Sequence, residues 1–157
     1  MPITASGGSY SDLVAQYILK HFNERGVSLY REVSLGKSII GKNRRVDILL
    51  VDHKRDRAVA IECKYQASAG TTDEKIPYAI QDMRSLQIPG FIVYAGEGFS
   101  TGVLHMLQAS DKAVHCLPSF EHQLARTTDT KELDHMLAMT LGWWDVLVDG
   151  KRPYDGA

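Results

Sequence analysis

Three residues in two neighbouring apolar segments have the types and spacing needed for metal-dependent hydrolysis. Asp47 lies in RVDILLV (residues 45–51), and Glu62 and Lys64 lie in AVAIECKYQ (residues 58–66). Side chains alternate between the two faces of a β-strand, so each segment presents one apolar face and one face that carries these charges. Two carboxylates and an amine on one face are suited to holding a hard divalent cation beside a phosphate or a water.

The register of the two strands follows from the polar turn at residues 52–57. A hairpin centred on this turn pairs residues whose numbers sum to 109, which places Asp47 opposite Glu62. We expect their Cβ atoms to be about 5 Å apart, with Lys64 about 7 Å further along the same face. A slip of one residue would send the two acids to opposite faces and misalign the apolar set, so the pattern favours this register.

The pair of acids predicts a Mg²⁺ site. Two carboxylates this close repel each other, and a divalent cation with oxygen ligands relieves the repulsion. Lys64 beside the cation can position a water, help to deprotonate it, or neutralise charge that develops on a phosphate. Gln66 continues the row and is a candidate to hold a phosphate oxygen or a water, so the predicted catalytic set is Asp47, Glu62, Lys64 and Gln66.

The alternative is that these side chains are solvated positions on the outer face of a half-exposed sheet. Alternation alone fits that interpretation. However, both acids stand in strongly apolar strands and in register, and Ala58 and Ala60 leave their face uncrowded. An uncrowded face favours a site that admits a polymer backbone.

The elements that must position these residues change type along the chain in the order αβββαβαβαα. A strand meander followed by crossovers predicts an α/β fold with a mixed central sheet flanked by helices, and with extra helices at the C-terminus. The expected helices are 9–25, 71–86, 101–109, 119–126 and 130–143, and the expected strands are 27–35, 44–51, 57–66, 91–95 and 113–117.

Asp47, fourteen intervening residues and then Glu62-Cys63-Lys64 resemble the motif of the PD-(D/E)XK nuclease superfamily, which has the restriction-endonuclease-like fold. The order of elements over about residues 9–117 is similar to the αβββαβ core of that fold. Val46 stands where the motif often has proline.

This resemblance implies a set of ligands. Asp47, Glu62 and the backbone carbonyl of Cys63 would bind Mg²⁺, with Mn²⁺ as an expected substitute, and Lys64 would assist the attacking water. Asp12 is a candidate for a further metal ligand, because an acid from the first helix reaches the metal in many members, and Glu24 is a weaker candidate. Alternatively, Asp12 completes a capping box with Ser9 at the start of that helix.

The net charge of −1 conceals a basic segment. Residues 31–64 hold nine Lys or Arg and five Asp or Glu, a net of +4, whereas the rest of the chain has a net of −5. This segment surrounds the predicted metal ligands, where phosphate contacts are needed. Lys75 follows two acids in the first turn of a predicted helix. The role of these three residues is either to cap the helix, since acids in a first turn favour the helix dipole, or to bring Lys75 to a phosphate. The candidate nucleic-acid contacts are Lys42, Arg44, Arg45 and Lys75.

With 157 residues, 44% of them hydrophobic, the chain fits one domain, with a core at about 9–117 and a helical extension at about 118–150. No apolar run approaches the roughly 20 residues that cross a bilayer, and the N-terminus lacks the features of a signal peptide. Cys63 and Cys116 lie in apolar runs, which suits free thiols in a reducing cytoplasm. If the chain is phage-encoded, the expected location is the cytoplasm of the host. We expect loose ends in the first eight residues and from about Asp149.

Together these features predict a small Mg²⁺-dependent DNA endonuclease of phage, restriction or junction-resolving type. The resemblance implies 5′-phosphate and 3′-hydroxyl products from duplex or branched DNA. One site cuts one strand, so we expect a homodimer. The alternative is a nuclease-fold module that binds nucleic acid without activity, although both acids and the lysine that activity requires are present.

Overall fold

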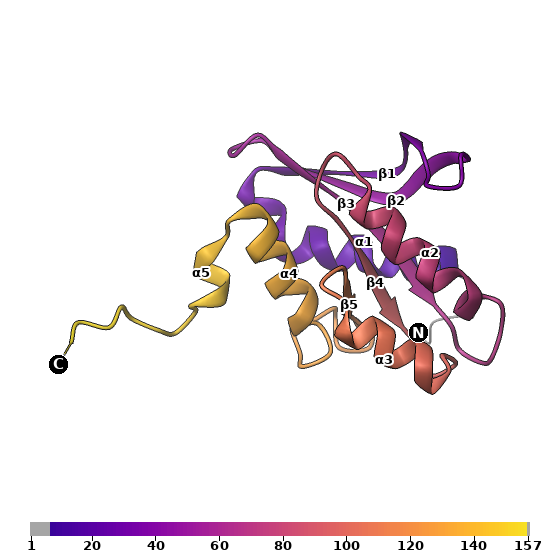
Figure 1. Ribbon diagram of the computed structural model, residues 1–157. Helices are drawn as coiled ribbons and strands as arrows, with labels where there is room; N and C mark the ends of the chain where they lie inside the picture. The colour runs from indigo at the N-terminus through magenta and orange to yellow at the C-terminus, as the bar shows by residue number, and fades with distance from the viewer. Residues whose placement is uncertain (1–6, 157) are drawn as a thin grey trace.

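The computed structural model describes residues 7–156 and contains one five-stranded mixed sheet flanked by helices (Figure 1). The strands lie across the sheet in chain order; β1 to β3 form an antiparallel meander, and β3, β4 and β5 are parallel. The predicted α/β fold with a mixed sheet is confirmed. The strands are β1 (Val27–Lys37), β2 (Asn43–Asp52), β3 (Arg57–Tyr65), β4 (Gly90–Ala95) and β5 (Ala113–His115), and the helices are α1 (Gly7–Phe22), α2 (Thr72–Arg84), α3 (Thr101–Ala109), α4 (Lys131–Leu141) and α5 (Trp144–Leu147).

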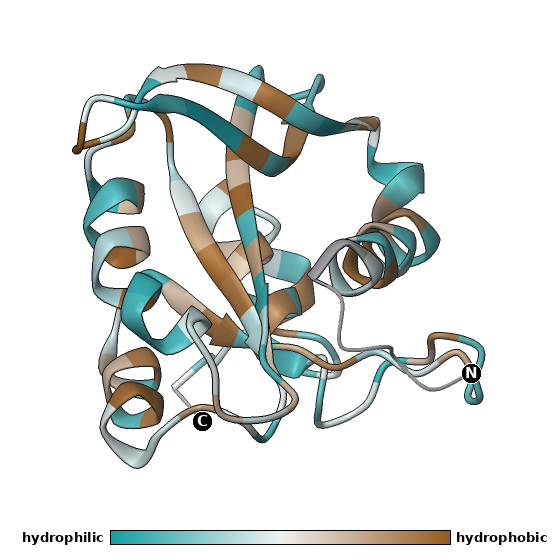
Figure 2. Ribbon diagram, turned by 90° about the vertical axis from the view of Figure 1, so that its right-hand side faces the viewer, coloured by the Kyte–Doolittle hydropathy of each residue, from teal (hydrophilic) through white to brown (hydrophobic). Residues whose placement is uncertain are grey.

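Helices cover both faces of the sheet because the central strands are apolar on both faces. On one face, α1 and α4 pack against inward residues of β2, β3 and β4 such as Ile48 and Val93. On the other face, α2 and α3 pack against Ile92 and Tyr94 of β4. Figure 2 shows the hydrophobic strands in the middle of the molecule with helices to either side. The face predicted to be apolar is buried at Val46, Ile48, Leu50, Val59, Ile61 and Cys63, and Tyr65 packs against it.

The predicted helix at 119–126 is wrong, because this segment is a series of turns. Gln123 and Leu124 both have φ of 56°, a left-handed conformation that a right-handed helix cannot continue. Their carbonyls accept hydrogen bonds from the side chains of Lys20 and His21 in α1, and the Leu124 side chain is buried. Docking on α1 therefore determines the backbone conformation of this segment and overrides its helical sequence pattern.

The ends of the helices differ in detail from prediction. α1 begins at Gly7, so Ser9 lies two residues inside it and not at the cap position that the alternative role of Asp12, a capping box, requires. A short 3₁₀ turn (Asn23–Arg25) follows α1, and Gly26, with φ of 77°, ends it after residue 25, which is the predicted end of the helix. Thr71 precedes α2 as its N-cap but makes no side-chain capping bond.

Among the described residues, the five strands of the sheet lie between residues 27 and 115. The expected loose N-terminal segment lies mostly at residues 1–6, outside those described. Residues 151–156 have no regular structure and run away from the body beyond α5 (Figure 1). No helix within residues 7–156 is long and apolar enough to cross a membrane.

Candidate active site

Asp47 and Glu62 lie where β2 and β3 separate. The two strands pair from Asp52↔Arg57 to Ile48↔Ile61, which is the predicted register with a sum of 109. Beyond Ile48 the ladder between them stops, while β3 continues to pair with β4 as far as Tyr65. The strands open at the two acids, and this opening gives a ligand access to their carboxylates.

Each acid is held by the backbone of the opposite strand. The backbone N–H of Asp47 donates to Oε1 of Glu62 at 3.2 Å, and the N–H of Cys63 donates to Oδ2 of Asp47 at 2.7 Å. These two bonds replace ladder bonds and fix both carboxylates side by side. Oδ1 of Asp47 and Oε2 of Glu62 accept no hydrogen bond from the described residues, so one oxygen of each acid remains for a cation.

Burial and mutual repulsion make the pair of acids hard to ionise. Burial, and then the charge of Asp47, raise the pKa of Glu62 to about 7. Burial also raises the pKa of Asp47. The hydrogen bond from the Cys63 N–H and the charges of Lys64 and Arg31 lower this pKa, but burial has the larger effect. A bound cation would stabilise the ionised form of both carboxylates, which is disfavoured when no cation is present.

Lys64 follows in β3 on the same face as Glu62. Its Nζ lies 3.8 Å from Oε2 of Glu62, and its side chain is 24% exposed. Its charge also acts on Asp47. The ammonium therefore stands beside both acids with access to solvent, where it can donate to a water or a phosphate oxygen.

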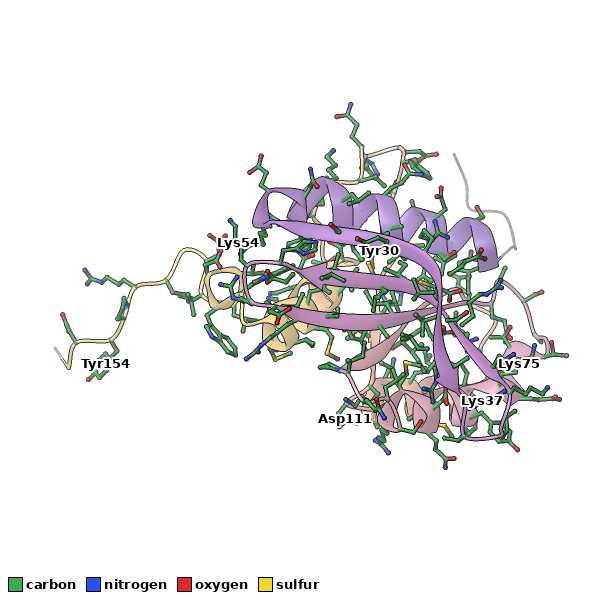
Figure 3. The ribbon with its side chains drawn as sticks, turned by 90° about the horizontal axis from the view of Figure 1, so that it is seen from above. Tyr30, Lys37, Lys54, Lys75, Asp111 and Tyr154 are labelled. Atoms are coloured by element: carbon green, nitrogen blue, oxygen red, sulfur yellow. The ribbon has the colours of Figure 1, made fainter. Side chains whose placement is uncertain are left out.

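A cleft of about 260 Å³ opens beside Glu62 and Lys64, between the tip of the β1–β2 hairpin and α2. Its lining includes all four residues predicted to contact nucleic acid: Lys42, Arg44, Arg45 and Lys75. Figure 3 shows Lys37 on the hairpin and Lys75 on α2 at the same end of the molecule. Residues far apart in sequence thus form one basic rim on the cleft that Glu62 and Lys64 line.

Arg44 serves a different purpose from the other three cations. Its guanidinium donates to both carboxylate oxygens of Asp82 in α2, at 2.7 and 2.9 Å, and also to Ser85 and the Leu35 carbonyl. Arg44 lowers the pKa of Asp82, and Asp82 raises that of Arg44. Because its donors are engaged, Arg44 clamps the hairpin to α2, and its contacts give no support to a role in binding phosphate.

Lys42, Arg45 and Lys75 are exposed. Their side chains form no ion pair with any residue of the described chain, in contrast to Arg44. Three exposed cations without a protein counter-charge remain available for phosphate.

Gln66 lies apart from the row of acids. Its amide donates to Asp73 Oδ1 at 3.1 Å and to the Gly98 carbonyl at 2.7 Å, and its Oε1 accepts from the Asp73 N–H at 3.1 Å. The side chain is buried and joins the end of β3 to the start of α2 and to the loop after β4. These contacts give no support to the predicted catalytic role and indicate a structural one.

Asp12 pairs with a residue that the sequence did not single out. Arg31 of β1 contacts Asp12 Oδ1 at 3.2 Å, donates to Ser11 at 2.7 Å, and lies 3.4 Å from the Asp47 carbonyl oxygen. Among the described residues no group of three or more acidic, His or Cys side chains is close enough to share a metal. Asp12 as a ligand therefore remains a prediction, and Arg31 stands between it and the site.

Arg31 and Glu32 could have been identified by extending the register argument to β1. Arg31 pairs with Ile48 and Val33 with Val46, which leaves Glu32 opposite Asp47 with φ of 54°. The charge of Glu32 also raises the pKa of Asp47. The signal is the pairing of β1, the first strand of the meander, with β2.

The oxygen donors fit Mg²⁺. Mg²⁺ is commonly bound through one or two carboxylates together with waters and substrate phosphates, which is what a pair such as Asp47 and Glu62 offers. The carbonyl of Cys63 is a third predicted donor. The thiol of Cys63 is buried in the core, and burial raises its pKa well above the ordinary range, so it offers no thiolate.

Comparison with protein families shows a match over most of the chain. Residues 6–144 match a model described as a PD-(D/E)XK nuclease superfamily domain. The match covers most of the chain and runs past residue 117, the predicted end of the core, to include α4. No curated protein and no solved structure gives a significant match. With an acid on β2, an acid and a lysine on β3, and a family match over this length, the chain belongs to the PD-(D/E)XK nuclease superfamily.

Proposed function

We propose that this protein is a Mg²⁺-dependent DNA endonuclease. The observation that carries the proposal is the position of Asp47, Glu62 and Lys64 where β2 and β3 separate, beside a cleft with a basic rim. The proposed substrate is duplex or branched DNA, and Mn²⁺ is expected to substitute for Mg²⁺. Restriction-like and structure-specific cutting both fit this site.

Asp47, Glu62 and the carbonyl of Cys63 would hold the cation. When bound, Mg²⁺ supplies positive charge that polarises the scissile phosphate and offsets the charge of the transition state. The acids contribute by being fixed in place, since each is bonded to the opposite backbone before any ligand arrives. Preorganisation of this kind lowers the reorganisation needed during reaction.

Lys64 would act on the attacking water and on the phosphate. Its Nζ, anchored 3.8 Å from Glu62 Oε2, can donate a hydrogen bond to either group. The water oxygen bonds to phosphorus and the water gives up one proton to solvent, while the P–O3′ bond breaks and the departing O3′ takes one proton from solvent. The products would be a 5′-phosphate and a 3′-hydroxyl.

Lys42, Arg45 and Lys75 would contact the DNA backbone. Their exposure and lack of ion pairs support this role, which adds affinity without sequence preference. Neutralising one of them is expected to reduce the slope of log K against log salt by about 0.9 per lost phosphate contact. Fluorescence anisotropy at a series of salt concentrations measures that slope.

We also propose a homodimer, because one site per chain cuts one strand and a double-strand cut needs two. Light scattering should give about 35 kDa, twice the 17.5 kDa of the chain. A mass of about 17 kDa at working concentration would exclude the dimer.

The test of the proposed function is incubation of supercoiled plasmid, branched DNA and single strands with Mg²⁺, Mn²⁺ or EDTA. We expect metal-dependent cutting by the wild type that is lost in Glu62→Gln and Lys64→Met. The matched controls Glu121→Gln and Lys131→Met, at exposed positions away from the cleft, should cut like the wild type. Binding without metal-dependent cutting on any substrate would instead identify an inactive nuclease-fold module.

A further inference from the structure

One wall of the cleft is apolar and open to solvent. Ile39 and Ile40, at the tip of the β1–β2 hairpin, are 42% and 54% exposed, and Tyr78 of α2 is 57% exposed. All three line the same cleft as Glu62 and Lys64. We call these three residues the apolar wall. Large apolar side chains gathered at a solvent-open cleft indicate a binding surface.

The apolar wall is held in a fixed position relative to the acids. The N–H of Ile39 donates to Asp82 Oδ1 at 3.1 Å, and Arg44 binds the same carboxylate from β2. Within the hairpin tip, the N–H of Ser38 donates to the Lys42 carbonyl at 2.8 Å. The hairpin and α2 thus act as one unit, and the wall is already formed before a ligand binds.

The charges around the wall indicate what kind of ligand it takes. Lys42, Arg45 and Lys75 line the same cleft and favour a polyanion, whereas the wall favours a flat or apolar group. A nucleotide combines the two, because its phosphate is anionic and its base has a π-face. Tyr78 offers a ring for stacking, and the two isoleucines offer apolar contact.

We propose that the apolar wall receives an unstacked nucleobase of the strand being cut, so that the enzyme favours DNA with unpaired bases beside the scissile phosphate. This inference rests on the proposed function and specifies its substrate. A base in an intact duplex must first leave the stack to reach the wall, whereas an unpaired base meets little of that cost. The preference therefore follows from the wall being apolar and adjacent to the acids.

The experiment compares binding of two DNAs with the same sequence, one fully paired and one with a central bubble of unpaired bases. Fluorescence anisotropy in EDTA measures affinity without cleavage. We expect the wild type to bind the bubble about fivefold or more tightly than the duplex. Tyr78→Ala should reduce affinity for the bubble by about fivefold or more, because stacking on one aromatic ring is lost.

Three further variants sharpen the test. Tyr78→Phe keeps the ring and should retain the preference, and Ile40→Ser should reduce it. Tyr154→Ala is the matched control, since Tyr154 is 87% exposed on the C-terminal tail and should not change either affinity. All three substituted positions are at the surface, and thermal unfolding of each variant checks that the fold is intact.

Equal wild-type affinity for both DNAs, or equal loss of both in Tyr78→Ala, would overturn the inference. If the wild type also cuts both DNAs at equal rates in Mg²⁺, the proposed endonuclease stands and only its substrate preference is wrong. If it neither binds nor cuts either DNA, the proposed function fails as well. Loss of a dimer in Ile40→Ser with unchanged DNA affinity would assign the wall to a second copy and would also overturn the inference.

Discussion

Replacing Glu62 with glutamine should stabilise the metal-free protein at neutral and alkaline pH. The pKa of Glu62 is raised from 4.5 to about 7, chiefly by burial and then by Asp47. Because the folded-state pKa lies above the unfolded value, the free energy of unfolding keeps its full value below about pH 4.5 and decreases as the pH rises to about 7. Glutamine carries no charge and avoids this decline.

The size of the effect follows from the pKa shift. A difference of about 2.5 pH units at 1.36 kcal/mol per unit corresponds to about 3 kcal/mol. The side chain of Glu62 is only 17% exposed, so solvent screening reduces this little. About three quarters of this decline falls between pH 5 and pH 8, because part of it has already occurred by pH 5. For a chain of this length, 1 kcal/mol shifts Tm by about 2–4 °C, so the relative change in Tm between pH 5 and pH 8 is about 5–10 °C.

Thermal and urea unfolding in EDTA at pH 5, 6, 7 and 8 measure this difference for wild type, Glu62→Gln and the control Glu121→Gln. The gap between Glu62→Gln and wild type should widen in favour of the variant as the pH rises. Mg²⁺ at pH 8 should then stabilise the wild type more than the variant. Parallel pH profiles for wild type and Glu62→Gln would refute the claim that the two acids are forced together in a buried site.

Three more predictions concern other contacts. Arg44→Met and Asp82→Asn should each lower the free energy of unfolding by about 3 kcal/mol, because each breaks the same partly buried ion pair. Urea unfolding should show the double mutant less destabilised than the sum of the two single losses, and additive losses would contradict the clamp. Trp143→Phe should cost about 1–3 kcal/mol in the same assay, because the indole N–H donates at 2.9 Å to fully buried Asp52, and an unchanged midpoint would count against that bond. The dissociation constant for Mg²⁺, measured by calorimetry, should rise about tenfold per pH unit below about 7, since a proton must leave Glu62; a constant that does not vary with pH would exclude Glu62 as a ligand.

The register of β2 and β3 was predictable because a single local pattern determines it. Apolar residues at every second position can be buried together in only one pairing, and that pairing brings Asp47 to Glu62. The same reasoning extended to β1 would have identified Arg31 and Glu32. The local alternation of apolar residues is therefore sufficient to predict these strands and the pairing of the two acids.

The roles of Arg44 and Gln66 were not predictable from local sequence. Arg44 binds Asp82, 38 residues away, and Gln66 binds the Gly98 carbonyl, 32 residues away. Both contacts depend on how α2 and the loop after β4 dock on the sheet, which side-chain alternation does not describe. The segment at 119–126 fails for a similar reason, since docking on α1 sets its backbone.

The most direct test of the central claim is the single-turnover rate of DNA cleavage in Mg²⁺ by wild type, Lys64→Met and Lys131→Met. Removing one group that stabilises charge or transfers a proton in the transition state costs about 10²- to 10³-fold in rate. Wild type and Lys131→Met should therefore cut at equal rates, with Lys64→Met at least about 100-fold slower and all cutting lost in EDTA. Cutting by Lys64→Met at the wild-type rate, or cutting that persists in EDTA, would contradict the claim that Lys64 and the two acids form a metal-dependent nuclease site.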